Sequence, residues 1–311
     1  MSQYKYIIYA PIYDETVGGA IVMHKLCHLI NECGGQAYLY PFVPSFELHH
    51  YNIQEIGLYI KAIHDASQVA NFRVNPAFKT PVITPRDNLV AGDDCIVVYP
   101  EIAFGNPLRA KNTVRWLLHN PGFHTGRVYF GSGEVYYRHG DSLLDNFQFH
   151  GSVVSDVVLR VQHVPLDLYI DDAPPQRDRS GTAYCLRKGK GRPAVHDLDD
   201  SILIDGKTHA ETAAIFKSVK RFISYDPYTH YSYFAAIAGC ESVVVPVDNM
   251  SKEQWRPNIE DRYGLAYGFD DLEFARATRE LAINRQIFLN NQSKECTLRF
   301  MEDIERRLAA R

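Results

Sequence analysis

Apolar residues alternate along the chain between short continuous runs and helically spaced sets. Tyr4–Ile12 is a short apolar run of the strand type, and in residues 20–32 the apolar positions recur every three or four residues. A second apolar run, Gln36–Phe42, follows the Gly34-Gly35 pair that ends this helical spacing. The order of strand, helix and strand predicts a β-α-β unit at the start of the chain.

The rest of the first half continues this alternation less regularly. Asp93–Tyr99 is apolar and rich in β-branched residues, which is typical of a strand buried on both faces of a parallel sheet. Pro107–Leu118 predicts a helix that starts at a proline, with Trp116–Leu118 as an alternative strand. We also expect a helix at Ile56–Ile63 and a hairpin or two short strands within Arg127–Tyr137.

A charged, proline-rich segment at Asp171–Ser180 has the composition of a linker. After it the alternation of strands and helices starts again. We expect strands at Gly181–Leu186, Ser201–Asp205 and Val243–Val247, helices at His209–Lys220 and Tyr231–Ala238, and two last helices, Leu272–Ala282 and Arg285–Leu308, separated near Ile283-Asn284. Two β/α halves joined by a linker predict an α/β protein with two Rossmann-like domains, residues 1–170 and 171–290.

Composition and charge narrow the classes of partner. The 311 residues are 46% hydrophobic and 23% charged, as in a soluble globular protein, and the net charge of −4 gives no basic field for nucleic acid. The six cysteines show neither a CxxC pair nor a Cys/His metal spacing, which fits reduced thiols in a cytoplasmic protein without a bound metal. No run of about 18 apolar residues occurs, so we expect no transmembrane helix. Peripheral contact with the inner face of a membrane is left open.

Residues suited to catalysis follow the predicted elements of the first half. Gly18-Gly19 opens the first helix, where glycine lets a ligand approach the backbone and the helix amides attract an anion. Neither half contains GxGxxG, the dinucleotide-binding fingerprint. Glu101 and His119 are candidate bases, and Asp14 is a third. Taken singly, a capping acid or a turn histidine explains each of them equally well.

The second half offers a basic loop and a polar loop. Arg187–Arg192, with the sequence RKGKGR, follows the carboxyl end of a predicted strand, where doubly wound sheets bind ligands. A solvated charged surface is the structural alternative, and we favour an anion site at Arg187 and Lys188. The second loop precedes the helix at Tyr231 and supplies three further candidates, Tyr225, Asp226 and Thr229. For Asp226 and Thr229 the alternative role is that of a helix cap.

With these features the chain resembles the GT-B glycosyltransferases. In that family two Rossmann-like domains face each other across a cleft, with the nucleotide-sugar donor mainly on the second domain and the acceptor mainly on the first. Gly18-Gly19 matches the diglycine turn that approaches the donor phosphates, and Arg187 and Lys188 match the basic residues that meet the pyrophosphate. The resemblance also implies that the C-terminal helix, residues 291–311, crosses back to pack on the first domain.

One motif of the retaining members is only half present. Those enzymes carry a Glu, seven residues, a second Glu, and then a small-residue helix end, a Gly and an apolar strand. Aligning that Gly with Gly239 places the first acid at Asp226 and the second at Phe234. The acid that usually holds the ribose hydroxyls is therefore missing, and this contact would fall to Thr229 or to a tyrosine hydroxyl. Stereochemistry and nucleotide stay open.

The resemblance implies a hexosyltransferase of polysaccharide biosynthesis, of the capsule or lipopolysaccharide type. It would move a sugar from a nucleotide sugar to a glycan or lipid-linked acceptor. Fixed cations and helix amides would neutralise the diphosphate leaving group, so no metal or other cofactor is expected. Two alternatives stand beside it. One is a sugar-nucleotide epimerase of the same fold, and the other is a non-catalytic protein that binds nucleotide sugars or glycans. The donor sugar, the base, the acceptor and the oligomeric state are not fixed by the sequence.

Overall fold

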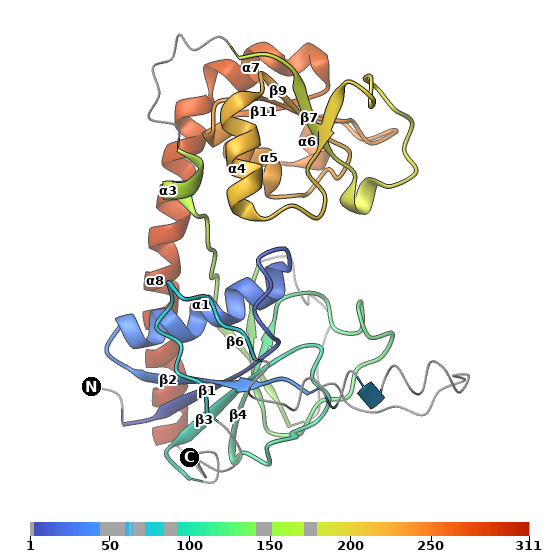
Figure 1. Ribbon diagram of the computed structural model, residues 1–311. Helices are drawn as coiled ribbons and strands as arrows, with labels where there is room; N and C mark the ends of the chain where they lie inside the picture. Colours follow the sequence, from blue (N-terminus) through green and yellow to red (C-terminus); the bar gives the residue numbers. More distant parts are fainter. Residues whose placement is uncertain are drawn as a thin grey trace. The chain divides into compact units, whose positions relative to one another are not determined.

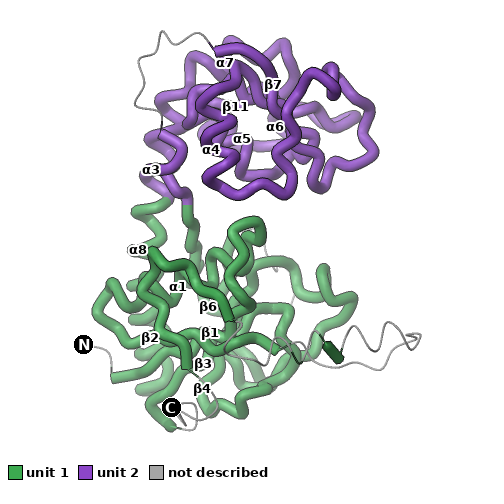
Figure 2. Tube along the Cα trace, viewed as in Figure 1, with its two compact units in different colours: residues 1–163, 290–311 green, residues 164–289 purple. Residues whose placement is uncertain are grey.

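The computed structural model describes residues 3–43, 60–61, 64, 72–83, 92–140, 151–170 and 179–310. The chain divides into two compact units (Figure 2). Unit 1 comprises residues 1–163 and 290–311, and unit 2 comprises residues 164–289. Each unit is built on its own parallel sheet, one of six strands and one of five. This confirms the α/β class expected from the alternation of apolar runs and helical spacings.

In unit 1 the strands follow the order β2-β1-β3-β4-β5-β6. Figure 1 labels β1 to β4 and β6 of this sheet. Their bounds are β1 Lys5–Ala10, β2 Gln36–Pro41, β3 Cys95–Pro100, β4 Asn112–Leu117, β5 Val135–Arg138 and β6 Val153–Val158. Helix α1, Gly18–Glu32, leads from β1 to β2, and the chain then returns to place β3 on the other side of β1. The strand order reverses between β1 and β3. Open parallel sheets bind ligands at such a switch point, outside the carboxyl ends of the strands.

Strand β1 shows how the sequence pattern builds this core. Tyr6 and Ile8 pack in the cluster beneath α1, whereas Ile7 and Tyr9 pack in a second cluster that includes Tyr99. Because successive side chains of a strand point to opposite faces, an uninterrupted apolar run fits a strand that is covered on both faces.

Helix α8, Arg279–Ala309, belongs to both units, since its residues from 290 onward group with unit 1. The carboxylates of Asp303 and Glu305 tie it to the first sheet, and the Tyr6 hydroxyl donates to Glu305 at 2.6 Å. Asp303 is buried and accepts hydrogen bonds from the hydroxyls of Tyr137, at 2.9 Å, and Ser155, at 2.7 Å. Arg307 donates to the same carboxylate from one turn further along α8, at 2.7 Å.

In unit 2 the strand order is β11-β10-β9-β7-β8, so the switch point lies between β7 and β9. The strands are β7 Thr182–Cys185, β8 Ser201–Leu203, β9 Arg221–Ser224, β10 Glu241–Val244 and β11 Leu265–Tyr267. The helices are α3 Leu166–Tyr169, α4 His209–Ser218, α5 Tyr231–Ile237, α6 Lys252–Trp255 and α7 Leu272–Ala277, with 3-10 turns η4 Arg187–Gly189, η5 Ile259–Arg262 and η6 Phe269–Asp271. Residues of α4 and α5 share one core cluster, and those of α7 share another with β9 and β10.

Three element predictions are wrong. Residues 107–118 do not form a helix, because β4 occupies Asn112–Leu117 and every one of its residues is buried. Only one strand, β5, forms within the segment expected to be a hairpin, and it pairs in parallel with β4. The last two helices separate at Thr278 rather than near residue 283, and the Thr278 hydroxyl there donates to the Phe274 carbonyl and accepts from the Gly264 amide.

Two further predictions fall largely outside the described residues. They are the helix at Ile56–Ile63 and the linker at Asp171–Ser180.

Candidate functional site

All the candidate residues of unit 1 follow strands that are neighbours in the sheet. Asp14 and Gly18-Gly19 come after β1, Glu101 comes directly after β3, and His119 comes after β4. Strands β1, β3 and β4 are adjacent and parallel, so the segments that follow them share one edge of the sheet. This edge contains the switch point between β1 and β3.

Glu101 is buried at this edge, and its carboxylate accepts a hydrogen bond from the Leu118 amide at 3.1 Å. The carboxylate therefore links the segment after β3 to the segment after β4. Burial raises the pKa of Glu101, although backbone hydrogen bonds and the positive charge of Arg115 act against the increase. A carboxyl group with a raised pKa is better suited to accept a proton near neutral pH than an ordinary surface carboxylate is.

The two glycines are the first residues of α1, so the helix starts two residues earlier than the apolar spacing suggests. Neither glycine has a positive φ. A Cβ at Gly18 would meet no atom within 4 Å in the described residues, and one at Gly19 would meet only Leu118, at 3.8 Å. The N-cap residue is Val17, whose side chain cannot accept a hydrogen bond from the first amides. The start of α1 thus presents an open backbone of the kind that receives anions.

His119 and Asp14 both bond within their own loops. The Asn120 amide donates to Nδ1 of His119 at 2.9 Å, and the imidazole packs on Phe123 with ring centroids 4.1 Å apart. Because this bond occupies the Nδ1 lone pair, the neutral ring carries its proton on Nε2. Asp14 accepts from the amide and the hydroxyl of Thr16, at 2.8 and 2.7 Å. Glu101 is therefore the best placed of the three candidate bases.

A buried ion pair between Arg115 and Glu134 fixes the backbone segment that carries Glu101. Arg115, on β4, donates to both carboxylate oxygens of Glu134, and the two side chains are 0% and 1% exposed. Its guanidinium also donates to the carbonyls of Ala103, at 2.6 Å, and Gly105, at 2.7 Å. These carbonyls lie just beyond Glu101, so the pair holds the segment that carries it. This role of Arg115 could not be predicted, because the residue falls in the segment expected to be a helix.

The candidates of unit 2 also flank a switch point. Arg187 and Lys188 follow β7, and the segment from Tyr225 to Thr229 follows β9. Strands β7 and β9 are adjacent and parallel. The two loops that the sequence singled out are therefore neighbours at the carboxyl edge of the second sheet.

Arg187 and Lys188 differ in how they are held. Arg187 has a left-handed φ of 43°, its amide donates to Asp205 at 2.8 Å, and its guanidinium lies over the ring of Tyr231 at 5.1 Å. Lys188 is exposed. Asp205 was not among the expected site residues, although its sequence signal, an acid just after a strand, is the same as that of Glu101.

The basic loop is fixed in place at Gly189 and Arg192. A Cβ at Gly189 would lie 2.1 Å from the carbonyl oxygen of Tyr225, so only glycine fits there. Arg192 donates to the carbonyls of Tyr225, at 2.8 Å, and Val245, at 3.1 Å, and also to that of Pro246. Arg192 thus holds the loop against the ends of β9 and β10.

The three candidates after β9 are all buried. The Tyr225 hydroxyl accepts from the Val195 amide at 2.9 Å and bonds to His196 Nδ1 at 3.0 Å, so this phenol faces the segment that follows the basic loop. Asp226 accepts from the Tyr228 amide at 3.0 Å, and Thr229 accepts from the Tyr231 amide at 3.3 Å. Both contacts are turn-forming bonds to backbone amides.

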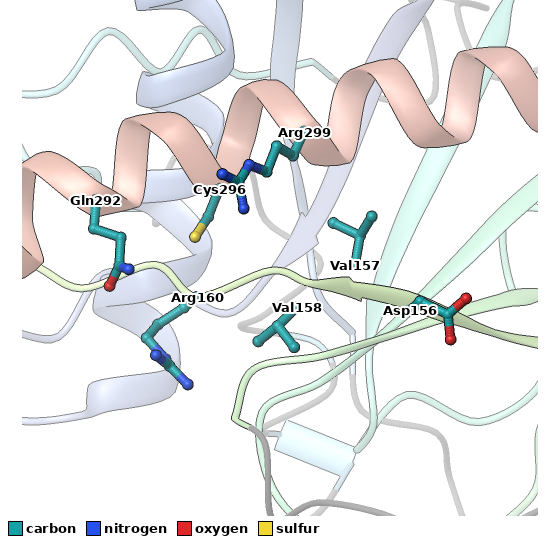
Figure 3. A pocket seen from close by; sticks show the side chains of 7 residues that line it. All are labelled: Asp156, Val157, Val158, Arg160, Gln292, Cys296 and Arg299. Carbon is teal, nitrogen blue, oxygen red and sulfur yellow. The ribbon is translucent and has the colours of Figure 1, made fainter.

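A pocket of about 300 Å³ lies elsewhere in unit 1, and none of the candidate residues line it (Figure 3). In Figure 3 the side chains of Gln292 and Cys296 project from α8 toward the chain that follows β6. Arg160 and Arg299 line the pocket, so it is a second place where an anion could bind, but Arg299 already pairs with Glu295. The pocket is lined by Asp156, Val157, Val158, Arg160, Gln292, Cys296 and Arg299.

Among the residues that the structure describes, no group of three or more His, Cys, Asp or Glu side chains is arranged to hold a metal ion. No helix in this part of the chain is long and apolar enough to cross a membrane. In the comparisons with known proteins, no family model matches the chain, and no curated protein shows a significant match to it.

Proposed function

We propose that the protein is a hexosyltransferase that moves a sugar from a nucleotide-sugar donor to a glycan or lipid-linked acceptor. In this proposal the two units are Rossmann-like domains that face each other across a cleft. The observation that carries it is in unit 2, where Arg187 and Lys188 after β7 lie beside Asp226 and Thr229 after β9. Cations next to hydroxyl-binding groups at a switch point suit a diphosphate that is joined to sugars.

Each group then has a defined role. Arg187 and Lys188 bind the pyrophosphate and stabilise the charge that develops on the leaving phosphate oxygen. Asp226 accepts hydrogen bonds from sugar or ribose hydroxyls, since its charge would repel a phosphate. Phe234 stands where the retaining GT-B enzymes, which the sequence resembles, place a second acid, but it is buried and stacks on Tyr169 at 4.6 Å. Its position therefore belongs to the core and contributes no ribose contact.

On the first unit, the proposal assigns Glu101 to the acceptor. In an inverting reaction Glu101 removes the proton of the acceptor hydroxyl, and that oxygen attacks the anomeric carbon. The bond from this carbon to the phosphate oxygen breaks, and the nucleoside diphosphate leaves with the electron pair. Gly18-Gly19 and the open start of α1 support the donor phosphates. A retaining reaction would not use this base.

The direct test is a thermal-shift screen against UDP-, GDP-, CMP- and dTDP-sugars, followed by product analysis. A donor at 100 times its dissociation constant should add about 2.7 kcal/mol of stability. A transferase extends an acceptor and releases a nucleoside diphosphate, or CMP where the donor is a CMP-sugar. An epimerase changes the sugar without any acceptor, and a binding protein is stabilised without turnover. Absence of stabilisation by every nucleotide sugar would contradict the proposal.

The basic loop provides a second test with an internal control. Lys188→Ala should raise the dissociation constant of the donor and reduce turnover, by roughly 100-fold or more if the lysine acts on the leaving group. Lys190→Ala removes another exposed lysine of the same loop and should change little. Equal behaviour of the two variants would mean that Lys188 belongs to a solvated charged surface.

A further inference from the structure

Arg256 lies at the carboxyl edge of the second sheet. It directly follows α6, and the indole of the preceding residue, Trp255, donates to the Pro227 carbonyl at 2.9 Å, in the loop after β9. The guanidinium of Arg256 lies over three aromatic rings, at 4.8 Å from Trp255, 5.3 Å from Tyr233 and 5.8 Å from Tyr228. These rings orient the cation without neutralising its charge.

The other arginines of unit 2 show how unusual this arrangement is. Seven of them donate to backbone carbonyls or carboxylates: Arg179, Arg192, Arg221, Arg262, Arg276, Arg279 and Arg285. Within the described residues the guanidinium of Arg256 has neither a hydrogen bond nor an ion pair. Its Nε atom is buried without a partner, as are those of Arg262 and Arg285, but the terminal nitrogens of those two arginines pair with carboxylates. A partly desolvated cation without a counter-charge is unfavourable, so an anionic ligand would be stabilised there.

The surroundings of Arg256 suggest what the rest of this ligand looks like. Tyr228, which is 54% exposed, and His230, which is also exposed, come from the loop that carries Asp226 and Thr229. Desolvation by surrounding protein, and then the charge of Arg256, lower the pKa of His230 despite its exposed surface, so the imidazole is neutral at pH 7. One cation beside a neutral imidazole, an exposed phenol and a hydroxyl-binding acid suits a sugar that carries an acidic group.

We propose that Arg256 binds an oxyanion of the ligand, and specifically a carboxylate on the donor sugar, as in a uronic acid. This inference rests on the proposed function. Two cations flank the loop between β9 and α5. Arg187 lies over Tyr231 and comes from the β7 side, whereas Arg256 lies over Tyr233 and comes from the β10 side. If the pyrophosphate occupies Arg187 and Lys188, Arg256 remains for the sugar end. A phosphate is the other source of the same oxyanion chemistry.

The test compares three ligands by calorimetry on the full chain: the nucleoside diphosphate that binds in the screen, its neutral hexose conjugate and its uronic acid conjugate. The wild type should bind the uronic acid conjugate about 10- to 100-fold more tightly than the hexose conjugate. Arg256→Gln should remove that preference and leave the affinity for the nucleoside diphosphate unchanged. If Arg256→Gln instead lowers the affinity for all three ligands, Arg256 still binds an oxyanion, and that oxyanion is a phosphate of the nucleotide.

Three controls make the result decisive. Arg276→Gln removes an exposed, already paired arginine of unit 2 and should keep the wild-type preference. Arg256→Lys keeps the charge without the planar fork, so a partial loss is expected even if the glutamine variant does not fold. Free glucuronate and inorganic pyrophosphate, followed by tryptophan fluorescence, probe Arg256 even if no nucleotide sugar binds. Wild-type binding of every anion by both Arg256 variants would overturn the inference.

Discussion

Asp226 is held by a turn that it forms itself, and this separates its structural role from the proposed binding role. Its carboxylate accepts from the Tyr228 amide. In Asp226→Asn the side-chain carbonyl can accept the same bond, so we expect a melting temperature close to that of the wild type. Donor affinity or turnover should fall, because the variant loses the charged acceptor for sugar hydroxyls. Wild-type kinetics in a folded Asp226→Asn protein would show that the residue only forms the turn.

Glu101 should give the reaction a characteristic pH dependence. Burial raises its pKa above the ordinary value of 4.5, so the base becomes active only above that pH. The acidic limb of a kcat/KM profile should have its midpoint above pH 4.5. In Glu101→Gln kcat/KM should be much lower, and this limb should be absent. His119→Gln should keep the limb. An acidic limb that disappears in His119→Gln instead would transfer the base role to the histidine.

The raised pKa of Glu101 also affects the stability of the protein. A carboxyl group whose pKa is raised on folding contributes stability that is fully present below its unfolded pKa and is lost as pH rises through the folded value. Glu101→Gln should therefore be at least as stable as the wild type at pH 7, since an amide oxygen can still accept from Leu118. Equilibrium unfolding in urea at pH 7 measures this, and it also shows whether a loss of activity has a structural cause.

Residue positions along the chain could be predicted better than residue contacts. Glu101 and Arg187 each follow an apolar strand, and each lies at the carboxyl edge of its own parallel sheet, a position that the sequence pattern predicts. The contacts of Arg192 join positions 33 and 53 residues apart in the sequence. No local pattern encodes such long-range hydrogen bonds. For the same reason the close approach of Gly189 to Tyr225 could not be foreseen.

At the level of elements, the errors arise where burial overrides local spacing. In β4 the run NTVRWL contains an arginine and two polar residues, which interrupts the apolar pattern of a buried strand. The structure buries Arg115 by pairing it with Glu134, a residue 19 positions away. The last helices were expected to separate near residue 283. The Ile283-Asn284 pair there is a weaker break than Thr278, whose hydroxyl bonds to two backbone groups.

The contribution of Asp303 to the packing of α8 on the first sheet should be lost at acid pH, between about 4 and 2. Desolvation opposes the charged form of Asp303, but hydrogen bonds led by those from Arg307, Ser155 and Tyr137 lower its pKa to about 2. A lowered carboxyl pKa contributes stability above the unfolded value of 3.8 that is lost as pH falls toward 2. This contribution is on the order of 2 kcal/mol.

Asp303→Asn should therefore lower the stability of unit 1 at pH 7 and flatten its dependence on pH between about 4 and 2. Denaturant unfolding followed over that range measures both effects. Glu302→Gln removes a neighbouring exposed acid of α8 and serves as the control, with the wild-type dependence expected. Parallel curves for the wild type and Asp303→Asn would mean that this carboxylate does not anchor the helix.

At the scale of the whole molecule, the proposal requires the two carboxyl edges to reach the same donor. Hydrogen exchange measures this directly on the full chain. A bound nucleotide sugar should slow amide exchange at residues 186–192 and 224–231 of unit 2, and also at residues 17–21, where α1 begins with Gly18-Gly19. The peptides that line the pocket of Figure 3, residues 156–160 and 292–299, should not change, because no candidate residue lines that pocket. Protection in unit 2 alone would remove the glycine pair from the donor site and would argue against a shared cleft. Protection in unit 1 alone would reverse the assignment of donor and acceptor to the two units.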